Sequence, residues 1–184
     1  MEGESLDETH PLWNVSRSRI VPRVAREMAA CVAPLLRVCK EVLFIDPHFG
    51  PENPRHRRPL EEFLAVILKG RDGVPPTRIE IHTSDEAKAL FFKDECEQRL
   101  PDIIPEGMSV RLVRWRQREG GEKLHNRFIL TDRGGVRFGV GLDDGEDGET
   151  DEVELLGEAT YQFRWAQYTS DPAFDFVDEV IIVR

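Results

Sequence analysis

The sequence predicts a single α/β domain in which helices flank a mixed β-sheet. A chain of 184 residues suits one domain and is long enough to bury a sizeable core. In its first half, apolar residues at helical spacing alternate with short apolar runs typical of strands. Strand-like runs separated by glycine-containing turns dominate its second half. We therefore expect one domain over residues 16–184, preceded by a flexible acidic N-terminus over residues 1–15.

The first predicted element is a helix that Ser16 or Ser18 can cap. Its apolar residues recur at spacings of four, four, three and four positions, and Pro34 should kink the helix or divide it. This stripe consists of Val24, Met28, Val32, Leu35 and Cys39. The apolar run over residues 41–46, which Pro47 ends, is typical of a buried strand.

A loop over residues 49–58 leads to a second helix, which a glycine ends. The apolar face of this helix comprises Leu60, Phe63, Leu64, Ile67 and Leu68. Residues 78–82 alternate as a strand, and Ser84 can cap a third helix that extends to about Leu100. Residues 108–115 alternate again and predict the next strand.

The second half is expected to contain mostly strands. Two glycines at 120 and 121 form a turn, and Gly134 and Gly135 form a hairpin. The predicted strands are the one that contains His125 and those over residues 136–140, 160–168 and 175–183.

The net charge of −10 comes mainly from one segment. The chain has 25 basic and 35 acidic side chains, and residues 143–154 hold eight of the acids with no Lys or Arg, so the other 172 residues carry only −2. The acidity argues against a general nucleic-acid coat protein, which would be basic. The simplest interpretation of this acidic loop is a solvated, mobile excursion. Alternatively, it docks on a basic loop, covers a binding pocket or recognises a protein partner.

Composition also indicates the compartment. No apolar run approaches the ~18–20 residues that span a bilayer, and the acidic N-terminus lacks a signal-peptide pattern. The cysteines Cys31, Cys39 and Cys96 are widely spaced among apolar residues, as expected of buried thiols in a reducing compartment. We expect a cytoplasmic protein.

A histidine and an arginine two residues apart, His125 and Arg127, are the most informative residues for function. On an extended strand their side chains point to one face, and Asn126 and Phe128 point to the other. Burying an imidazole and a guanidinium requires partners for both. A phosphate or carboxylate is a suitable partner, because Arg offers a planar fork of donors. The alternative is a hydrogen-bonded structural histidine and an arginine that a nearby carboxylate satisfies.

The spacing from His125 and Arg127 to Asp132, followed by Gly-Val-Gly-Leu, resembles the His-x-Lys-x4-Asp motif of the phospholipase D superfamily. In that family the motif precedes a strand that ends in Gly-Ser-x-Asn. This chain has Arg127 in place of the lysine, Val140 in place of the serine and Leu142 in place of the asparagine.

A narrower similarity is to the phospholipase D-like C-terminal domain of MIT-domain proteins. That domain reads roughly His-Asp-Arg-x-Ile, then a glycine-rich turn, then Gly-x-Gly-Leu-Asp. It also carries an upstream strand ending in Asp-Pro-aromatic, similar to residues 44–49 here. The order of elements agrees from about Glu41 to the C-terminus, so the resemblance covers most of the chain. The resemblance implies a lipid- and partner-binding module rather than an enzyme.

The superfamily resemblance implies a metal-independent phosphodiesterase that uses no cofactor. His125 would attack phosphorus, and its copy in a second subunit would protonate the leaving oxygen. Asp132 would orient the imidazole, and Arg127 would neutralise charge on the phosphoryl oxygens. Phospholipase D enzymes carry two such motifs and this chain carries one, so a complete site would need a homodimer. We expect a nuclease first. The alternative is a catalytically inactive module that binds anionic phospholipid headgroups or a protein partner.

Further candidate phosphate-binding side chains lie upstream. His48 follows the predicted strand 41–46, at the end where α/β sheets place their ligands. Asp46 most simply begins a turn with Pro47. The basic loop that follows is either a solvated surface or a phosphate clamp, and it contains Arg55, His56, Arg57 and Arg58. No group of His, Cys, Asp and Glu has a spacing along the chain that suits zinc, so we expect no metal site.

Overall fold

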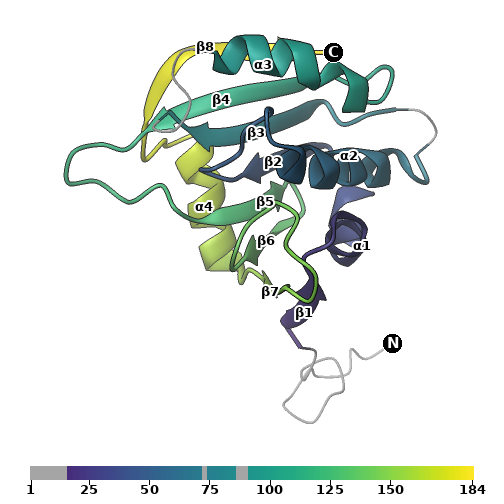
Figure 1. Ribbon diagram of the computed structural model, residues 1–184. Helices are drawn as coiled ribbons and strands as arrows, with labels where there is room; N and C mark the ends of the chain where they lie inside the picture. The colour runs from purple at the N-terminus through teal and green to yellow at the C-terminus, as the bar shows by residue number, and fades with distance from the viewer. Residues whose placement is uncertain (1–15, 72–73, 86–90) are drawn as a thin grey trace.

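The computed structural model describes residues 16–71, 74–85 and 91–184, which form one eight-stranded sheet with helices on both faces (Figure 1). The strand order is β1-β7-β6-β5-β2-β3-β4-β8. The central strands β2, β3 and β4 run parallel, and every other neighbouring pair is antiparallel. The predicted α/β class with a mixed sheet is confirmed.

The elements follow in a regular order along the chain. The strands are β1 (Ser18–Pro22), β2 (Glu41–Ile45), β3 (Arg78–Ser84), β4 (Val110–Arg116), β5 (Arg127–Thr131), β6 (Gly134–Phe138), β7 (Thr150–Leu155) and β8 (Asp175–Val183). The helices are α1 (Ala25–Leu36), α2 (Pro54–Leu68), α3 (Phe92–Arg99), the short 3-10 helix η1 (Pro101–Ile103) and α4 (Glu158–Tyr168).

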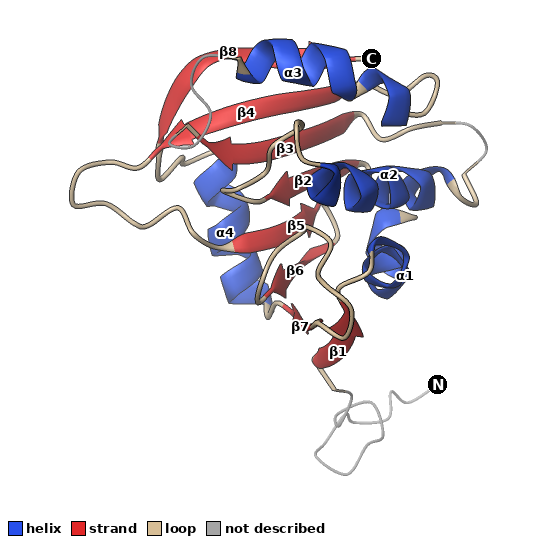
Figure 2. Ribbon diagram, in the orientation of Figure 1, coloured by secondary structure: helices blue, strands red, loops and turns tan. Residues whose placement is uncertain are grey.

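Two apolar cores lie on opposite faces of the sheet (Figure 2). Met28 of α1, Phe63 of α2 and Phe44 of β2 belong to the first core, and α3 contributes to it as well. The second core packs Tyr161 of α4 against Phe128 of β5. Because both faces of the central strands are covered, β2 is apolar along almost its whole length, as the sequence predicts for a buried strand.

The start of the chain differs from the prediction. Residues 18–22 form the edge strand β1 and pair with β7, and the helix begins only at Ala25. Neither Ser16 nor Ser18 caps it. The cap comes from a distant residue instead, because Oδ1 of Asp144 accepts the backbone N–H of Ala25 at 2.7 Å.

The predicted strand over residues 160–168 is wrong, because this segment is helix α4. In this segment the aromatic residues Tyr161, Phe163 and Trp165 alternate, a pattern that is typical of a strand. In the structure Tyr161 and Tyr168, two helical turns apart, are buried against the sheet, whereas Phe163 is exposed. Packing of the helical face therefore outweighs the local alternation.

The two charged loops are also partly regular structure. The basic residues 55–58 form the start of α2, where the side chain of Asn53 accepts the N–H of Arg55. The acidic segment 143–154 divides into a loop over residues 143–149 and the strand β7.

No helix in the described ranges is long and apolar enough to cross a membrane. The three cysteines are free thiols, and Cys39 and Cys96 are buried as predicted. The predicted flexible N-terminus over residues 1–15 lies outside the described residues.

Candidate functional site

His125 lies in the connection between β4 and β5, two residues before β5 begins, and its side chain is exposed. Its Nδ1 is 3.1 Å from the carbonyl oxygen of Lys123. A carbonyl oxygen can only accept, so Nδ1 carries the proton in this contact and a neutral ring has its lone pair on Nε2. The backbone therefore selects the tautomer that a nucleophilic imidazole requires.

Arg127 is the first residue of β5 and pairs in register with Phe138 of β6. Its side chain is half-buried, and Nη1 donates a hydrogen bond to the carbonyl oxygen of His125 at 2.7 Å. The Nε atom is buried and has no hydrogen-bond partner among the described residues. A buried N–H donor without an acceptor lowers the stability of the folded chain. Arg127 is therefore suited to bind a ligand that supplies a hydrogen-bond acceptor.

An open cavity of about 300 Å³ lies beside these two residues. It is lined by His125, Asn126, Arg127, Arg137, Phe138 and Gly139. Arg137, from β6, is also paired with Glu154 at 2.8 Å. In the register of β5 and β6, Arg127 pairs with Phe138 on the face of the first core, whereas Arg137 pairs with Phe128 on the α4 face. The groups of this cavity that suit a phosphate-like anion are therefore the His125 imidazole and the Arg127 guanidinium.

Asp132 lies at the other end of β5 from His125, because the whole strand Arg127–Thr131 separates them. A five-residue strand spans roughly 16 Å, far beyond the reach of a carboxylate. Oδ1 of Asp132 instead accepts the backbone N–H groups of Lys40 at 2.6 Å and Glu41 at 3.1 Å. The prediction that Asp132 orients the His125 imidazole is wrong, since its carboxylate fixes the start of β2.

A buried carboxylate that the sequence analysis missed holds the turn after β6. Asp151, in β7, is 2% exposed, and its two oxygens accept the backbone N–H groups of Gly139, Val140 and Gly141 at 2.8–3.4 Å. Successive amides around one carboxylate form an anion nest, and here the chain itself fills it. No sequence pattern distinguishes Asp151 from its acidic neighbours, because the partner amides are recognisable only in the folded chain.

The residue that replaces the asparagine of the phospholipase D motif is part of the core. Leu142 is 7% exposed, and its backbone N–H donates to Oδ2 of Asp46 at 2.9 Å. Val140, in place of the motif's serine, is 48% exposed. Neither side chain provides a hydrogen-bonding group near His125.

The predicted phosphate clamp contacts acids of the same chain. The ion pairs join Arg55 to Asp143 at 3.3 Å and to Glu146 at 3.7 Å, and Arg58 to Asp144 at 3.7 Å. Arg57 donates a hydrogen bond to the carbonyl oxygen of Pro51. None of these three arginines lines the His125 cavity, and neither does the exposed His48.

The loop over residues 143–149 is fixed in place, so the interpretation as a mobile excursion is wrong. Arg23, which is 6% exposed, pairs with Asp143 at 2.7 Å and with Glu149 at 2.8 Å. Asp144 caps α1 and also accepts the Nε–H of Arg55 through its carbonyl oxygen. The alternative that this acidic loop docks on the basic residues is therefore confirmed.

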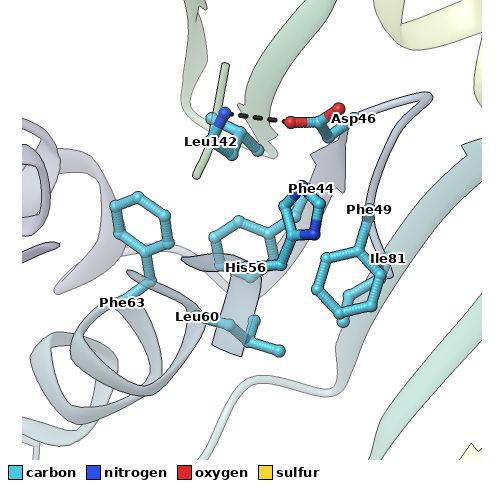
Figure 3. Close-up of a pocket in the computed structure, with 8 residues that line it drawn as sticks. All are labelled: Phe44, Asp46, Phe49, His56, Leu60, Phe63, Ile81 and Leu142. Atoms are coloured by element: carbon cyan, nitrogen blue, oxygen red, sulfur yellow. Dashed lines mark hydrogen bonds between the residues drawn. The ribbon is translucent and has the colours of Figure 1, made fainter. Parts of the chain in front are cut away.

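The fold also brings together a group of metal-ligating side chains that spacing along the chain does not reveal. Asp46, His56 and Asp143 each offer a ligand atom, and these atoms all lie within 4.8 Å of one another. Asp46 and His56 also line a small apolar cavity between the sheet and α2 (Figure 3). The expectation of no metal site considered only spacing along the chain, whereas these three side chains come from separate elements.

A second polar network missed from the sequence is buried on the α4 side of the sheet. The indole N–H of Trp115 donates to Nδ1 of His82 at 2.8 Å, and Nε2 of His82 is 3.1 Å from Glu80. Burial lowers the pKa of His82 more than Glu80 raises it, so the ring is neutral. Burial alone would raise the pKa of Glu80, but hydrogen bonds from His82 and Arg78 lower it to about 2.

Comparison with known proteins places the fold. The structure is similar to Nuc, a phospholipase D family member from Salmonella typhimurium, with a TM-score of 0.50 and 10% sequence identity over 88% of this chain and 98% of that chain. TrmBL2, an archaeal chromatin protein described with a novel mode of DNA binding, gives a TM-score of 0.40 at 12% identity over 94% of this chain and 57% of that chain. No family model matches the sequence, and no curated protein matches it.

At 10% identity the likeness to Nuc concerns the fold, so the chain has a phospholipase D-like fold. The narrower similarity to the C-terminal domain of MIT-domain proteins remains a prediction.

Proposed function

We propose that this protein is a phosphodiesterase of the phospholipase D type that acts on nucleic acid as a homodimer. The observation that carries the proposal is the cavity that His125 and Arg127 line at the start of β5. The imidazole has the tautomer of a nucleophile, and Arg127 provides positive charge for a phosphoryl group. The phospholipase D-like fold is consistent with this chemistry and does not establish it by itself.

In the proposed reaction, Nε2 of His125 attacks phosphorus and forms a phosphorus–nitrogen bond. The bond from phosphorus to the leaving oxygen breaks, and a protonated His125 of a second chain gives its proton to that oxygen. The same imidazole, now neutral, then removes a proton from water, whose oxygen attacks phosphorus and releases His125. Neither step consumes a metal or an organic cofactor.

The donor set of Arg127 is suited to the charge that develops in both steps. Its Nη1 is held by the carbonyl of His125, while its buried Nε is unpaired among the described residues. A phosphoryl oxygen bound to Nε would satisfy this donor and share the charge. Arginine, unlike the lysine of the motif, can contact two oxygens at once.

A second chain is required because one His125 cannot be nucleophile and general acid in the same step. His125 is exposed on a connection that extends beyond the sheet, so a two-fold axis through this region can bring two copies together (Figure 1). Light scattering should show a dimer at micromolar concentration. A monomer at high micromolar concentration, or a dimer whose cross-links avoid residues 123–139, would contradict the shared site.

Hydrolysis assays test the catalytic assignment. Single-stranded DNA, RNA and anionic phospholipid should be offered in parallel, in buffer with excess chelator. We expect His125→Ala to reduce nucleic-acid hydrolysis to background while leaving anion binding nearly intact. Arg127→Ala should lower both, by about tenfold or more in affinity, because the charged contact is made before and during the reaction.

Arg127→Lys restores the residue of the motif, and Arg133→Lys is its matched control. Arg133 is exposed and pairs with Asp132 at the far end of β5, so the control should keep full activity. Lysine at position 127 should cost rate, because a single ammonium cannot donate to the His125 carbonyl and to two phosphoryl oxygens with the planar geometry of arginine. Equally undetectable hydrolysis by wild type, His125→Ala and Arg127→Lys on all three substrates would reject the enzyme.

The second candidate function is a catalytically inactive module that binds anionic headgroups. It is favoured by the environment of positions 140 and 142, where an exposed valine and a buried leucine replace the polar residues of the motif. Asp151 also fills the amide nest beside the cavity. Binding of wild type to phosphoinositide vesicles that Arg127→Ala abolishes, without hydrolysis of any diester, would favour this module.

A further inference from the structure

Three side chains from separate elements converge at the carboxyl end of β2. Asp46 follows the last residue of β2, His56 lies in the first turn of α2, and Asp143 follows the turn after β6. One ligand atom from each lies within 4.8 Å of the others. Tetrahedral ligands at about 2.0–2.2 Å from a zinc ion are separated by about 3.3–3.6 Å, so side-chain movements of roughly 1 Å close the site.

The surroundings hold these ligands in place. Oδ1 of Asp46 accepts the backbone N–H of His48 at 2.9 Å, and Oδ2 accepts that of Leu142 at the same distance. The Asp46 side chain is 3% exposed, and each of its oxygens retains a second lone pair. Outer hydrogen bonds of this kind orient metal ligands and raise their affinity.

His56 has an acceptor in the position that its metal-binding tautomer needs. Nδ1 accepts the backbone N–H of Gly50 at 3.1 Å and also lies 3.3 Å from the carbonyl oxygen of the same residue. Metal binding through Nε2 requires the other tautomer, in which Nδ1 carries the proton and donates to that carbonyl; Figure 3 shows Nε2 on the side of the Asp46 carboxylate. The ring also packs on Phe49, with the ring centres 5.7 Å apart.

The floor of the site is apolar and has almost no free space. Asp46 and His56 line a cavity of about 10 Å³, whose other lining residues are Phe44, Phe49, Leu60, Phe63, Ile81 and Leu142 (Figure 3). This volume holds one water molecule at most. Asp143 already pairs with Arg23 and Arg55, whereas the buried Asp46 carboxylate contacts only backbone N–H groups among the interactions described above. A cation shared by the three side chains would bring a counter-charge to Asp46.

The local charge balance favours a divalent cation. Three guanidinium groups, from Arg23, Arg55 and Arg58, pair with this loop, while its ion-paired acids together with Asp46 contribute five carboxylates. The five acids are Asp46, Asp143, Asp144, Glu146 and Glu149. Without His56, the three guanidinium groups and five carboxylates sum to a formal charge of −2, which a divalent ion would cancel. Arg23 contacts Oδ1 of Asp143 and Arg55 contacts Oδ2, and each of these oxygens has a further lone pair that can bind the ion.

We propose that Asp46, His56 and Asp143 bind one divalent transition-metal ion of the zinc class. The mixed set of one imidazole and two carboxylates suits such an ion, whereas magnesium and calcium prefer oxygen ligands alone. Three protein ligands leave one tetrahedral position for water. The bound ion would join the end of β2, the start of α2 and the loop over residues 143–149. Binding does not require the proposed phosphodiesterase activity.

Zinc titration against a chromophoric competitor tests the site on the full chain. Wild type should bind one zinc per chain, and tenfold or greater excess magnesium should not displace it. His56→Gln and Asp143→Asn should each weaken zinc binding by at least about tenfold. The matched control is His48→Gln, which removes an exposed imidazole outside the cluster and should bind zinc as wild type does.

X-ray absorption at the zinc edge identifies the ligand atoms in the wild-type protein, so this test needs no substitution. One imidazole nitrogen and carboxylate oxygens at about 2.0–2.2 Å are expected, with no sulfur. Sulfur ligands, equal weakening by His48→Gln and His56→Gln, or no saturable zinc binding would overturn the proposal. A wild-type His56 that NMR shows to be protonated at pH 7.5 in the presence of zinc would also overturn it, because a proton would then occupy the place of the ion.

Discussion

The buried network of Glu80, His82 and Trp115 makes a quantitative prediction about stability and pH. His82 is 1% exposed and uses both ring nitrogens, since the indole N–H donates to Nδ1 and Nε2 contacts Glu80. Because an indole can only donate, the imidazole must be neutral in this arrangement. Protonation of His82 would break the contact with Trp115 and bury a second positive charge beside Arg78.

The substitution His82→Asn removes the titrating imidazole and retains a hydrogen-bond acceptor for Trp115. The asparagine oxygen can occupy the position of Nδ1 and accept from Trp115, but no atom reaches Glu80. The lost hydrogen bond to a charged carboxylate costs about 1.5–3 kcal/mol, and the space left by the smaller side chain adds to this. We expect unfolding at pH 7.5 to become easier by about 2–4 kcal/mol.

The pH dependence follows from the directions of the two pKa shifts. The pKa of His82 is lowered on folding by burial, so its contribution is complete above the unfolded value near 6.5 and is lost as pH falls. The loss is at most about 1.4 kcal/mol per pH unit. The pKa of Glu80 is lowered to about 2, so its contribution is lost only between about pH 4.5 and pH 2. Between pH 6.5 and pH 5, above the Glu80 window, His82 is therefore the member of the network that changes stability.

Urea unfolding followed by far-ultraviolet circular dichroism at pH 7.5, 6 and 5 provides the measurement. Wild type should lose more stability than His82→Asn between pH 6.5 and pH 5, so the gap between the two curves should narrow as pH falls. A gap that stays constant from pH 7.5 to pH 5 would refute a neutral buried His82. A cost below 1 kcal/mol at pH 7.5 would refute the energetic role of the network.

Three further substitutions check the assignments around the sheet, each by urea unfolding. Asp132→Ala should lower the free energy of unfolding by about 1–3 kcal/mol, because two backbone N–H groups at the start of β2 lose their acceptor. Anion binding in the His125 cavity should stay unchanged. Weaker anion binding by this variant would show that Asp132 contributes to the site. Asp144→Ala should cost about 0.5–2 kcal/mol through loss of the α1 cap, and an unchanged midpoint would contradict that role. Leu142→Asn should destabilise by about 2–4 kcal/mol, since it places an amide in the apolar floor, and a neutral effect would show that position 142 can face the cavity.

The elements of the parallel core could be predicted from the sequence because their patterns are local. The strand over residues 41–45 is apolar, the face of α2 recurs at helical spacing, and β3 and β4 alternate. Local patterns failed where packing overrode them. Tyr161, Phe163 and Trp165 alternate like a strand, yet burial of Tyr161 and Tyr168 on one face selects a helix.

For the candidate site, the sequence placed His125 and Arg127 close together, but the observed strand does not include His125, which lies in the connection before β5. The extended segment between His125 and Asp132 already keeps their side chains apart, whereas the actual partners of Asp132, the backbone N–H groups of Lys40 and Glu41, are set by the pairing of strands in the sheet. The sequence also could not show that the acidic loop holds Arg23 and Arg55, or that Asp46, His56 and Asp143 meet. These contacts join residues up to 126 positions apart, and only the folded chain brings such residues together.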